Sequence, residues 1–164
     1  EKSREIPELE GMGTTIEVAL VHNNRVYIGH IGDSRIYRIR KEFIRKLTTD
    51  HSYVQKLVKD GRISKEEAVH HPKKNMLTKA LGCTSFVEPD VTVKGFLKDD
   101  ILVLTSDGLT NMVSKEQIFN IVQGNIEVTP FLPKPSIDTS SNALVIILPS
   151  KLVQVPKLIE LKGN

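Results

Sequence analysis

The chain has 164 residues, of which 39% are hydrophobic and 26% are charged, as in an ordinary globular domain with a core of its own. The net charge of +3 is too small to indicate nucleic-acid binding. No apolar run approaches the ~18 residues of a membrane-spanning helix. We therefore expect neither a nucleic acid nor a membrane as a partner.

The first residues and the single cysteine bear on the cellular compartment. The segment EKSREIPELE is polar and lacks the apolar region of a secretory signal peptide. Cys83 has no second cysteine with which to form an internal disulfide, which fits a reducing environment. We expect a cytoplasmic protein.

Two strands are predicted at the start of the chain, in TTIEVALVHNNRVYIGHIG (residues 14–32). They are joined at Asn23-Asn24, because asparagine tolerates the backbone conformations of a tight turn. Apolar residues alternate on one face of the first strand at Ile16, Val18 and Leu20.

A third and a fourth strand, RIYRIR (35–40) and FIRKLT (43–48), complete a predicted antiparallel meander. Ile36 and Ile39 fall out of strict alternation. A basic cluster, offset only by Glu42, lies on this predicted hairpin and has two interpretations: solvated faces, or a surface for acidic or phosphorylated partners. Its members are Arg35, Arg38, Arg40, Lys41, Arg45 and Lys46.

A helical insertion interrupts the strands. YVQKLVKDG has helical spacing with a stop at Gly61, and SKEEAVHHP opens with the capping-box pair Ser64 and Glu67 and ends at Pro72. NMLTKALG (75–82) is predicted to add one or two helical turns.

Strand patterns return in VTVKGF (91–96) and ILVLTS (101–106), and a helix follows in SKEQIFNIV, opened by Ser114 and Gln117 in capping-box spacing. The stretch 124–141 holds three of the eight prolines and is predicted to be an irregular loop. NALVIIL (142–148) has the composition of a buried strand. We expect one domain over residues 1–148 and a tail over 149–164.

Two predicted strands end in an aspartate beside a glycine, at Gly32-Asp33 and at Asp107-Gly108. Mg²⁺ and Mn²⁺ prefer oxygen ligands, often one or two carboxylates together with water and substrate phosphate. Strand ends are rigid positions for such ligands. Each pair by itself also fits an ordinary turn, so the residues alone leave both interpretations open.

A set of motifs resembles the metal-dependent protein serine/threonine phosphatases of the type 2C (PPM) family, especially the bacterial forms. The matching segments occur in the family's order and cover roughly residues 11–122. They are GMGTT (11–15), GHIGDSRIY (29–37), LTTDHSYVQKLVKDGRIS (47–64), HPKKNMLTKALG (71–82), VEPD (87–90) and SDGLTNMV (106–113).

This resemblance implies an α+β fold, an antiparallel β-sandwich with flanking helices and a helical flap, here residues 48–82. It implies Asp107 as a ligand of a two-metal centre of Mn²⁺ or Mg²⁺. Asp33 would help to hold a third metal that Asp107 also touches, and the backbone carbonyl of Asn75 is a further, weaker candidate. The implied reaction is hydrolysis of phosphoserine and phosphothreonine in proteins by a metal-activated water.

The sequence departs from the family in two places. The family's earlier Asp-Gly metal motif and its phosphate-binding arginine have no counterpart in the ten residues before Gly11, so we expect a truncated domain. The family's later Gly-x-Asp-Asn motif is represented by SSNALVIIL, in which Asn142 is in place and Ser141 occupies the position of the metal-binding aspartate.

Three hypotheses about the function of the chain follow. The first is a protein phosphatase acting on phosphorylated proteins, and the second is a non-catalytic module that keeps the sandwich and flap and binds phosphoproteins or regulates a partner. The third is a sandwich without metal. Within the predicted flap, His51 is expected to hydrogen-bond rather than to catalyse, and Lys73, Lys74 and Lys79 are either solvated or attract phosphoproteins. The oligomeric state is not predicted.

Overall fold

The computed structural model describes residues 5–124 and the backbone of residues 145–149. No helix in these ranges is long and apolar enough to cross a membrane. The elements in chain order are η1 (Pro7–Leu9), β1 (Ile16–His22), β2 (Arg25–Ile31), β3 (Arg35–Arg40), β4 (Phe43–Lys46), α2 (Tyr53–Lys59), α3 (Lys65–His70), β5 (Asp90–Gly95), β6 (Ile101–Thr105), α4 (Asp107–Thr110), α5 (Lys115–Gly124) and β7 (Val145–Pro149).

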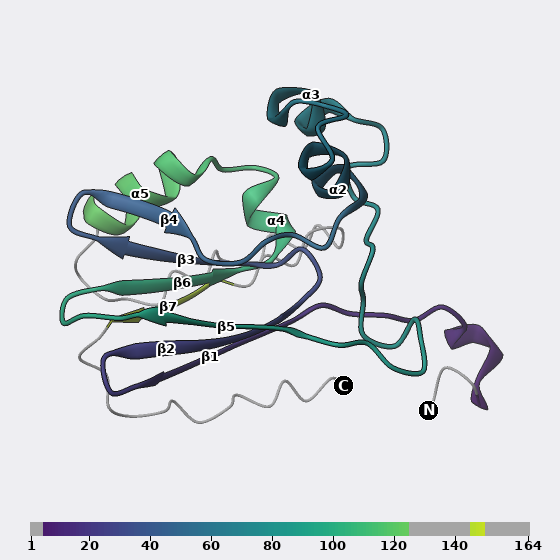
Figure 1. Ribbon diagram of the computed structural model, residues 1–164, viewed down its shortest axis with the longest axis horizontal. Helices are drawn as coiled ribbons and strands as arrows, with labels where there is room; N and C mark the ends of the chain where they lie inside the picture. Colours follow the sequence, from purple (N-terminus) through teal and green to yellow (C-terminus); the bar gives the residue numbers. More distant parts are fainter. Residues whose placement is uncertain (1–4, 125–144, 150–164) are drawn as a thin grey trace, which may run out of the picture.

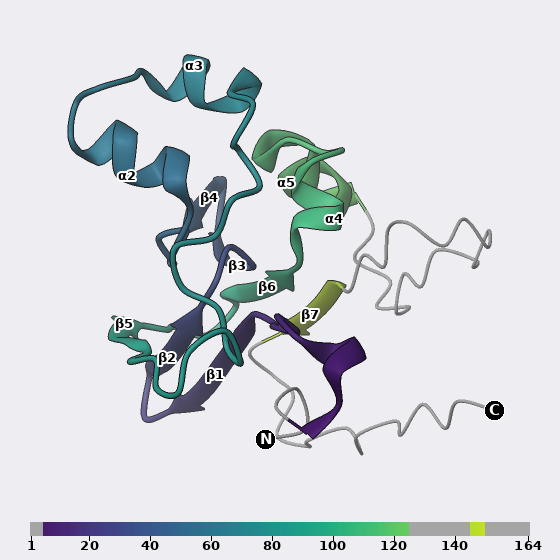
Figure 2. The same cartoon turned by 90° about the vertical axis from the view of Figure 1, so that its right-hand side faces the viewer.

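The strands form two antiparallel sheets that face each other, one of order β1-β2-β5 and the other of order β4-β3-β6-β7. Figures 1 and 2 show α4 and α5 on the outer side of the four-stranded sheet and the pair α2–α3 projecting from one end of the sandwich. The predicted α+β sandwich is confirmed. The continuous meander is wrong, because the chain leaves the first sheet after Ile31 and enters the second at Arg35.

The β1–β2 turn is as predicted. Asn23 and Asn24 have φ values of 47° and 58°, the left-handed pair that matches the twist of a two-residue hairpin. The register pairs His22 with Arg25 and continues along both strands to Ile16 opposite Ile31.

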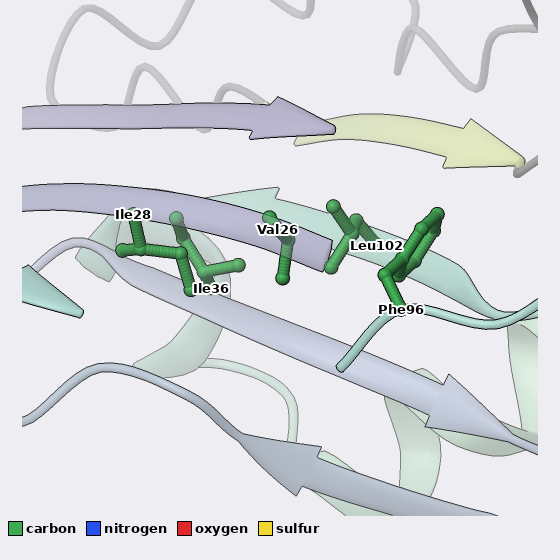
Figure 3. Close-up of a cluster of buried hydrophobic side chains, with 5 residues drawn as sticks. All are labelled: Val26, Ile28, Ile36, Phe96 and Leu102. Atoms are coloured by element: carbon green, nitrogen blue, oxygen red, sulfur yellow. The ribbon is translucent and has the colours of Figure 1, made fainter. Parts of the chain in front are cut away.

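The main core lies between the two sheets (Figure 3), where Val26, Ile28, Ile36, Leu102 and Phe96 are buried against one another. Full burial of such an aliphatic side chain contributes about 1.5–3 kcal/mol, so this cluster is the main apolar link between the sheets.

A second buried cluster lies under α5 and consists of Tyr37, Ile39, Val103, Ile118 and Val122. Strand β3 is therefore covered on both faces. This explains why its isoleucines break the alternation, since Ile36 faces the other sheet and Ile39 faces the helix.

The outer face of the three-stranded sheet is apolar and exposed. Within the described ranges no helix covers it (Figures 1 and 2). The alternating residues of β1 point to this face, while Glu17 and Ala19 point inward. The exposed residues are Ile16, Val18, Leu20, Tyr27, Val91 and Val93.

The flap connects β4 to β5 and contains both predicted helices. Ser52 caps α2, and α3 begins with the predicted capping box of Ser64 and Glu67. The predicted helical turns at 75–82 are wrong. This segment instead makes extended bridges, Leu77 with Ser52 and Leu81 with Thr14, which return the flap to the body of the domain.

The predicted capping box of α5 is also present, since the Ser114 amide donates to Gln117 Oε1 at 2.9 Å and the Gln117 amide to Ser114 Oγ at 3.2 Å. The strand predicted over 142–148 is confirmed as β7 over the described part. The predicted proline-rich loop from residue 125 to 141 and the tail after Pro149 lie outside the described residues.

Most of the basic cluster on β3 and β4 is bound internally rather than solvated. The guanidinium of Arg40 makes a bidentate contact with the buried carboxylate of Asp100, in which both N–O distances are 2.7 Å. Arg38 donates to the carbonyl of Gly95 at 2.7 Å. The long arginines thus close one end of the sandwich, and the solvated-face interpretation holds only for members such as Lys41 and Arg45, which are exposed.

Replacing Asn24 tests the turn. Asn24→Ala should lower the free energy of unfolding by about 1 kcal/mol, because alanine resists positive φ, whereas Asn24→Gly should leave it unchanged or raise it slightly. Urea denaturation measures both. Equal losses for the two variants would show that the side chain, and not its backbone conformation, matters.

Candidate functional site

Asp33 and Asp107 lie at the same end of the sandwich because of the pairing between β3 and β6. Arg35, the first residue of β3, is opposite Thr105, the last residue of β6. Asp33 lies in the bend two residues before β3, and Asp107 begins a short helix two residues after β6. The two aspartates singled out from the sequence therefore lie at the same end of one strand pair, where the charge of Asp107 acts on Asp33.

The two carboxylates repel each other. The pKa of Asp33 is raised by burial, and further by the negative charges of Asp107 and Asp50. Asp107 is the first residue of the short helix α4, where its carboxylate accepts a weak contact of 3.4 Å from the Asn111 amide. Within residues 5–124 neither Asp33 nor Asp107 forms an ion pair, and the charge of Arg35 offsets only part of the effect of burial and of the neighbouring carboxylates on the pKa of Asp33.

Paired oxygen ligands of this kind suit one hard divalent cation that completes its shell with water. They do not suffice for two metals. The described residues contain no group of three or more His, Cys, Asp or Glu side chains placed to hold a metal. Ser141 and Asn142, the other predicted positions, lie outside the described residues.

Asn75, the third predicted contributor, lies in the flap. It lines a cavity of about 420 Å³ between the segment around Gly13 and the end of the flap, together with Thr78, Lys79 and Cys83. The lining of this cavity includes neither aspartate. The metal contact of the Asn75 carbonyl stays a prediction.

Gly32 fixes the approach to Asp33. Its φ is 111°, and a Cβ there would lie 2.3 Å from Thr15 Cγ2, because the β1–β2 register continues to place Thr15 opposite Gly32. Thr15 also shares a hydrogen bond of 2.7 Å with Ser34. The residues on both sides of Asp33 are therefore held against Thr15, just before β1.

Asp50 anchors the strand next to this loop, and sequence reasoning missed it. It is 8% exposed and binds Arg35 through two nitrogens, the shortest distance being 2.7 Å, and Lys46 at 2.9 Å. Burial opposes ionisation, but Arg35 and Lys46 outweigh it and lower the pKa of Asp50. The available signal was an acid in the segment TTDHS (48–52), at the start of the flap.

A second missed group is the pair Glu17–His30, in which Nδ1 of His30 lies 2.5 Å from the carboxylate and Nε2 donates to the Thr49 carbonyl at 2.8 Å. Burial raises the pKa of Glu17. Burial lowers the pKa of His30, but Glu17 and the Thr49 carbonyl raise it more, so its net shift is upward. The inward-facing Glu17 on an otherwise apolar strand was the sequence signal.

Comparison with known proteins bears directly on this geometry. The family model described as protein phosphatase 2C matches residues 2–144. The chain belongs to the protein phosphatase 2C family. It is 46% identical over 116 residues to the serine/threonine phosphatase stp of Listeria innocua and to the protein phosphatase PhpP of Streptococcus pneumoniae, covering 71% of this chain and 46% and 47% of those proteins.

Solved type 2C phosphatases share its fold. The Mycobacterium tuberculosis serine/threonine phosphatase PstP/Ppp matches with a TM-score of 0.70 and 41% identity over 74% of this chain and 52% of that one. A structure of the PstP catalytic domain in complex with two manganese ions matches with a TM-score of 0.66, at 39% identity, over 74% of this chain and 50% of that one. The chain spans about half the length of these type 2C relatives.

Gly32→Ala tests the fixed approach to Asp33. We expect a loss of at least about 2 kcal/mol in the free energy of unfolding, because the new methyl group meets Thr15 and the positive φ is strained. Gly95→Ala is the matched control, since a Cβ at Gly95 meets nothing within 4 Å. Equal stability of both variants, measured by thermal denaturation, would contradict the tight contact.

The Glu17–His30 pair predicts a pH dependence. Both pKa values are raised, so the folded chain binds more protons than the unfolded chain and its stability falls as pH rises. This contribution is fully present below the ordinary values of 4.5 and 6.5 and is lost as pH passes the folded pKa values. Glu17→Gln should flatten the pH dependence of urea unfolding, and His22→Gln, at an exposed histidine, should not. Parallel curves for wild type and Glu17→Gln would refute the coupling.

Proposed function

We propose that this chain forms part of a metal-dependent protein phosphatase that hydrolyses phosphoserine and phosphothreonine in proteins. The observation that carries the proposal is the proximity of Asp33, just before β3, to Asp107, just after β6, where the charge of Asp107 helps to raise the pKa of Asp33. Membership of the type 2C family supports the same reaction. The domain would extend over residues 1–148, with the flap at its edge.

Asp33 and Asp107 would hold a divalent cation, Mn²⁺ or Mg²⁺, through their carboxylate oxygens. When bound, such a cation would supply charge neutralisation for the phosphoryl group and an activated water. A centre of two or three cations needs further anionic ligands beyond those of the described residues. The two manganese ions bound by the related PstP domain support manganese as the probe to use.

The other residues of this end of the domain would orient the site. Asp50, held by Arg35 and Lys46, would fix the start of β3. In the flap, Lys73 lies 5.6 Å from the Tyr53 ring centroid, and it and Lys74 are exposed. These lysines would attract phosphorylated proteins. A cytoplasmic location is supported by the single free Cys83.

One observation favours a second function. The described residues supply two carboxylates where a two-metal centre of charge about +4 needs several, so the alternative is a non-catalytic module that binds phosphoproteins. Hydrolysis and binding can be measured on the same protein.

Manganese-dependent hydrolysis of a phosphothreonine peptide tests the proposal. Asp107→Asn should lower the rate by at least about 100-fold, since loss of a ligand should cost no less than loss of a supporting contact. Asp60→Asn changes an exposed aspartate at the end of α2 and should leave the rate unchanged.

Two outcomes would count against it. Equal rates for wild type and Asp107→Asn would show that Asp107 does not serve the reaction. If folded wild-type protein binds the phosphopeptide but does not hydrolyse it at saturating Mn²⁺, the binding module is correct instead.

A further inference from the structure

His51 holds Gly32 by both of its backbone groups. The His51 amide donates to the Gly32 carbonyl at 2.8 Å, and the Gly32 amide donates to Nδ1 of His51 at 3.1 Å. Gly32 directly precedes Asp33 and adopts the positive φ of 111°. The imidazole nitrogen thus satisfies a buried donor, and a buried amide without an acceptor would be unfavourable.

The imidazole of His51 is itself held in one orientation. It is buried and stacked on the ring of His30, with centroids 4.5 Å apart and planes 30° apart. Because Nδ1 accepts a hydrogen bond, the neutral ring carries its proton on Nε2, which lies 3.0 Å from a carboxylate oxygen of Asp90. The stack on His30 thus holds the ring that contacts Gly32, and Asp90 lies beside its other nitrogen.

His51 also belongs to the base of the flap. Its carbonyl accepts from the Thr78 amide at 2.8 Å, which ties the first residues of the flap to the last. Asp90, its neighbour at the start of β5, binds Lys79 at 2.8 Å. One residue therefore contacts the loop of Asp33 on one side and the closed base of the flap on the other.

We propose that His51 is a positioning residue: it sets the direction of Asp33 through its two hydrogen bonds to the backbone of Gly32, and so links the flap to the carboxylate pair. The significance of this role for catalysis rests on the proposed function, whereas the hydrogen bonds between His51 and Gly32 do not. If His51 only filled space in the core, an apolar residue of similar size could replace it. If His51 acts through Nδ1 as a hydrogen-bond acceptor, asparagine should replace it instead, because its Oδ1 can accept the same hydrogen bond.

Hydrogen exchange of the full chain, read at Gly32 and Asp33 by NMR, tests the role. In His51→Leu, exchange at these two amides should become at least about tenfold faster, while amides of β6 and α5 change much less. His51→Asn should restore exchange to within about threefold of wild type. His71→Leu is the control, because Nδ1 of His71 also accepts a backbone amide, that of Lys73, but within the flap.

Three results would overturn the proposal. They are unchanged exchange at Gly32 in His51→Leu, an equal rise over every strand, and an asparagine variant no better than leucine. Phosphatase activity is not needed for this test. If the exchange pattern is as expected and the wild-type protein hydrolyses no phosphopeptide, the proposed function fails and the positioning role stands.

Discussion

The repulsion between two carboxylates at the end of one strand pair, Asp33 and Asp107, is the interaction on which the proposed metal site depends. Asp33 lies just before β3 and Asp107 just after β6, and burial together with the charge of Asp107 raises the pKa of Asp33. The chain keeps the aspartates and surrounds them with fixed backbone. Such an arrangement costs stability in the free protein, and a cation bound between the two charges would compensate for that cost.

The neighbouring charges show how selectively this end of the domain is neutralised. Asp50 has Arg35 and Lys46, Asp90 has Lys79, and Glu17 has His30. Among the carboxylates gathered here in the described ranges, Asp33 and Asp107 are left without an ion pair. These are the two residues that the sequence motifs predicted as metal ligands, in a chain that spans about half the length of its relatives.

Local rules predicted much of the fold. The Asn23-Asn24 turn and both capping boxes could be predicted because each depends on residues within a few positions of one another. The assignment of strands to the two sheets could not be predicted, since it depends on which strands pair over long range, as at the passage from β2 to β3. The segment 75–82 has helical composition but is used in bridges to Ser52 and Thr14. Asp33 and Asp107 were predicted from their strand ends, whereas Asp50, Glu17 and His30 were missed because burial gives them their meaning.

The most direct test of the account is the position of bound manganese. Crystals soaked in Mn²⁺ should show an anomalous difference peak in contact with carboxylate oxygens of both Asp33 and Asp107, and the peak should disappear in Asp33→Asn. A well-ordered wild-type structure with manganese bound elsewhere, or with both aspartates turned to solvent at saturating Mn²⁺, would contradict the central claim.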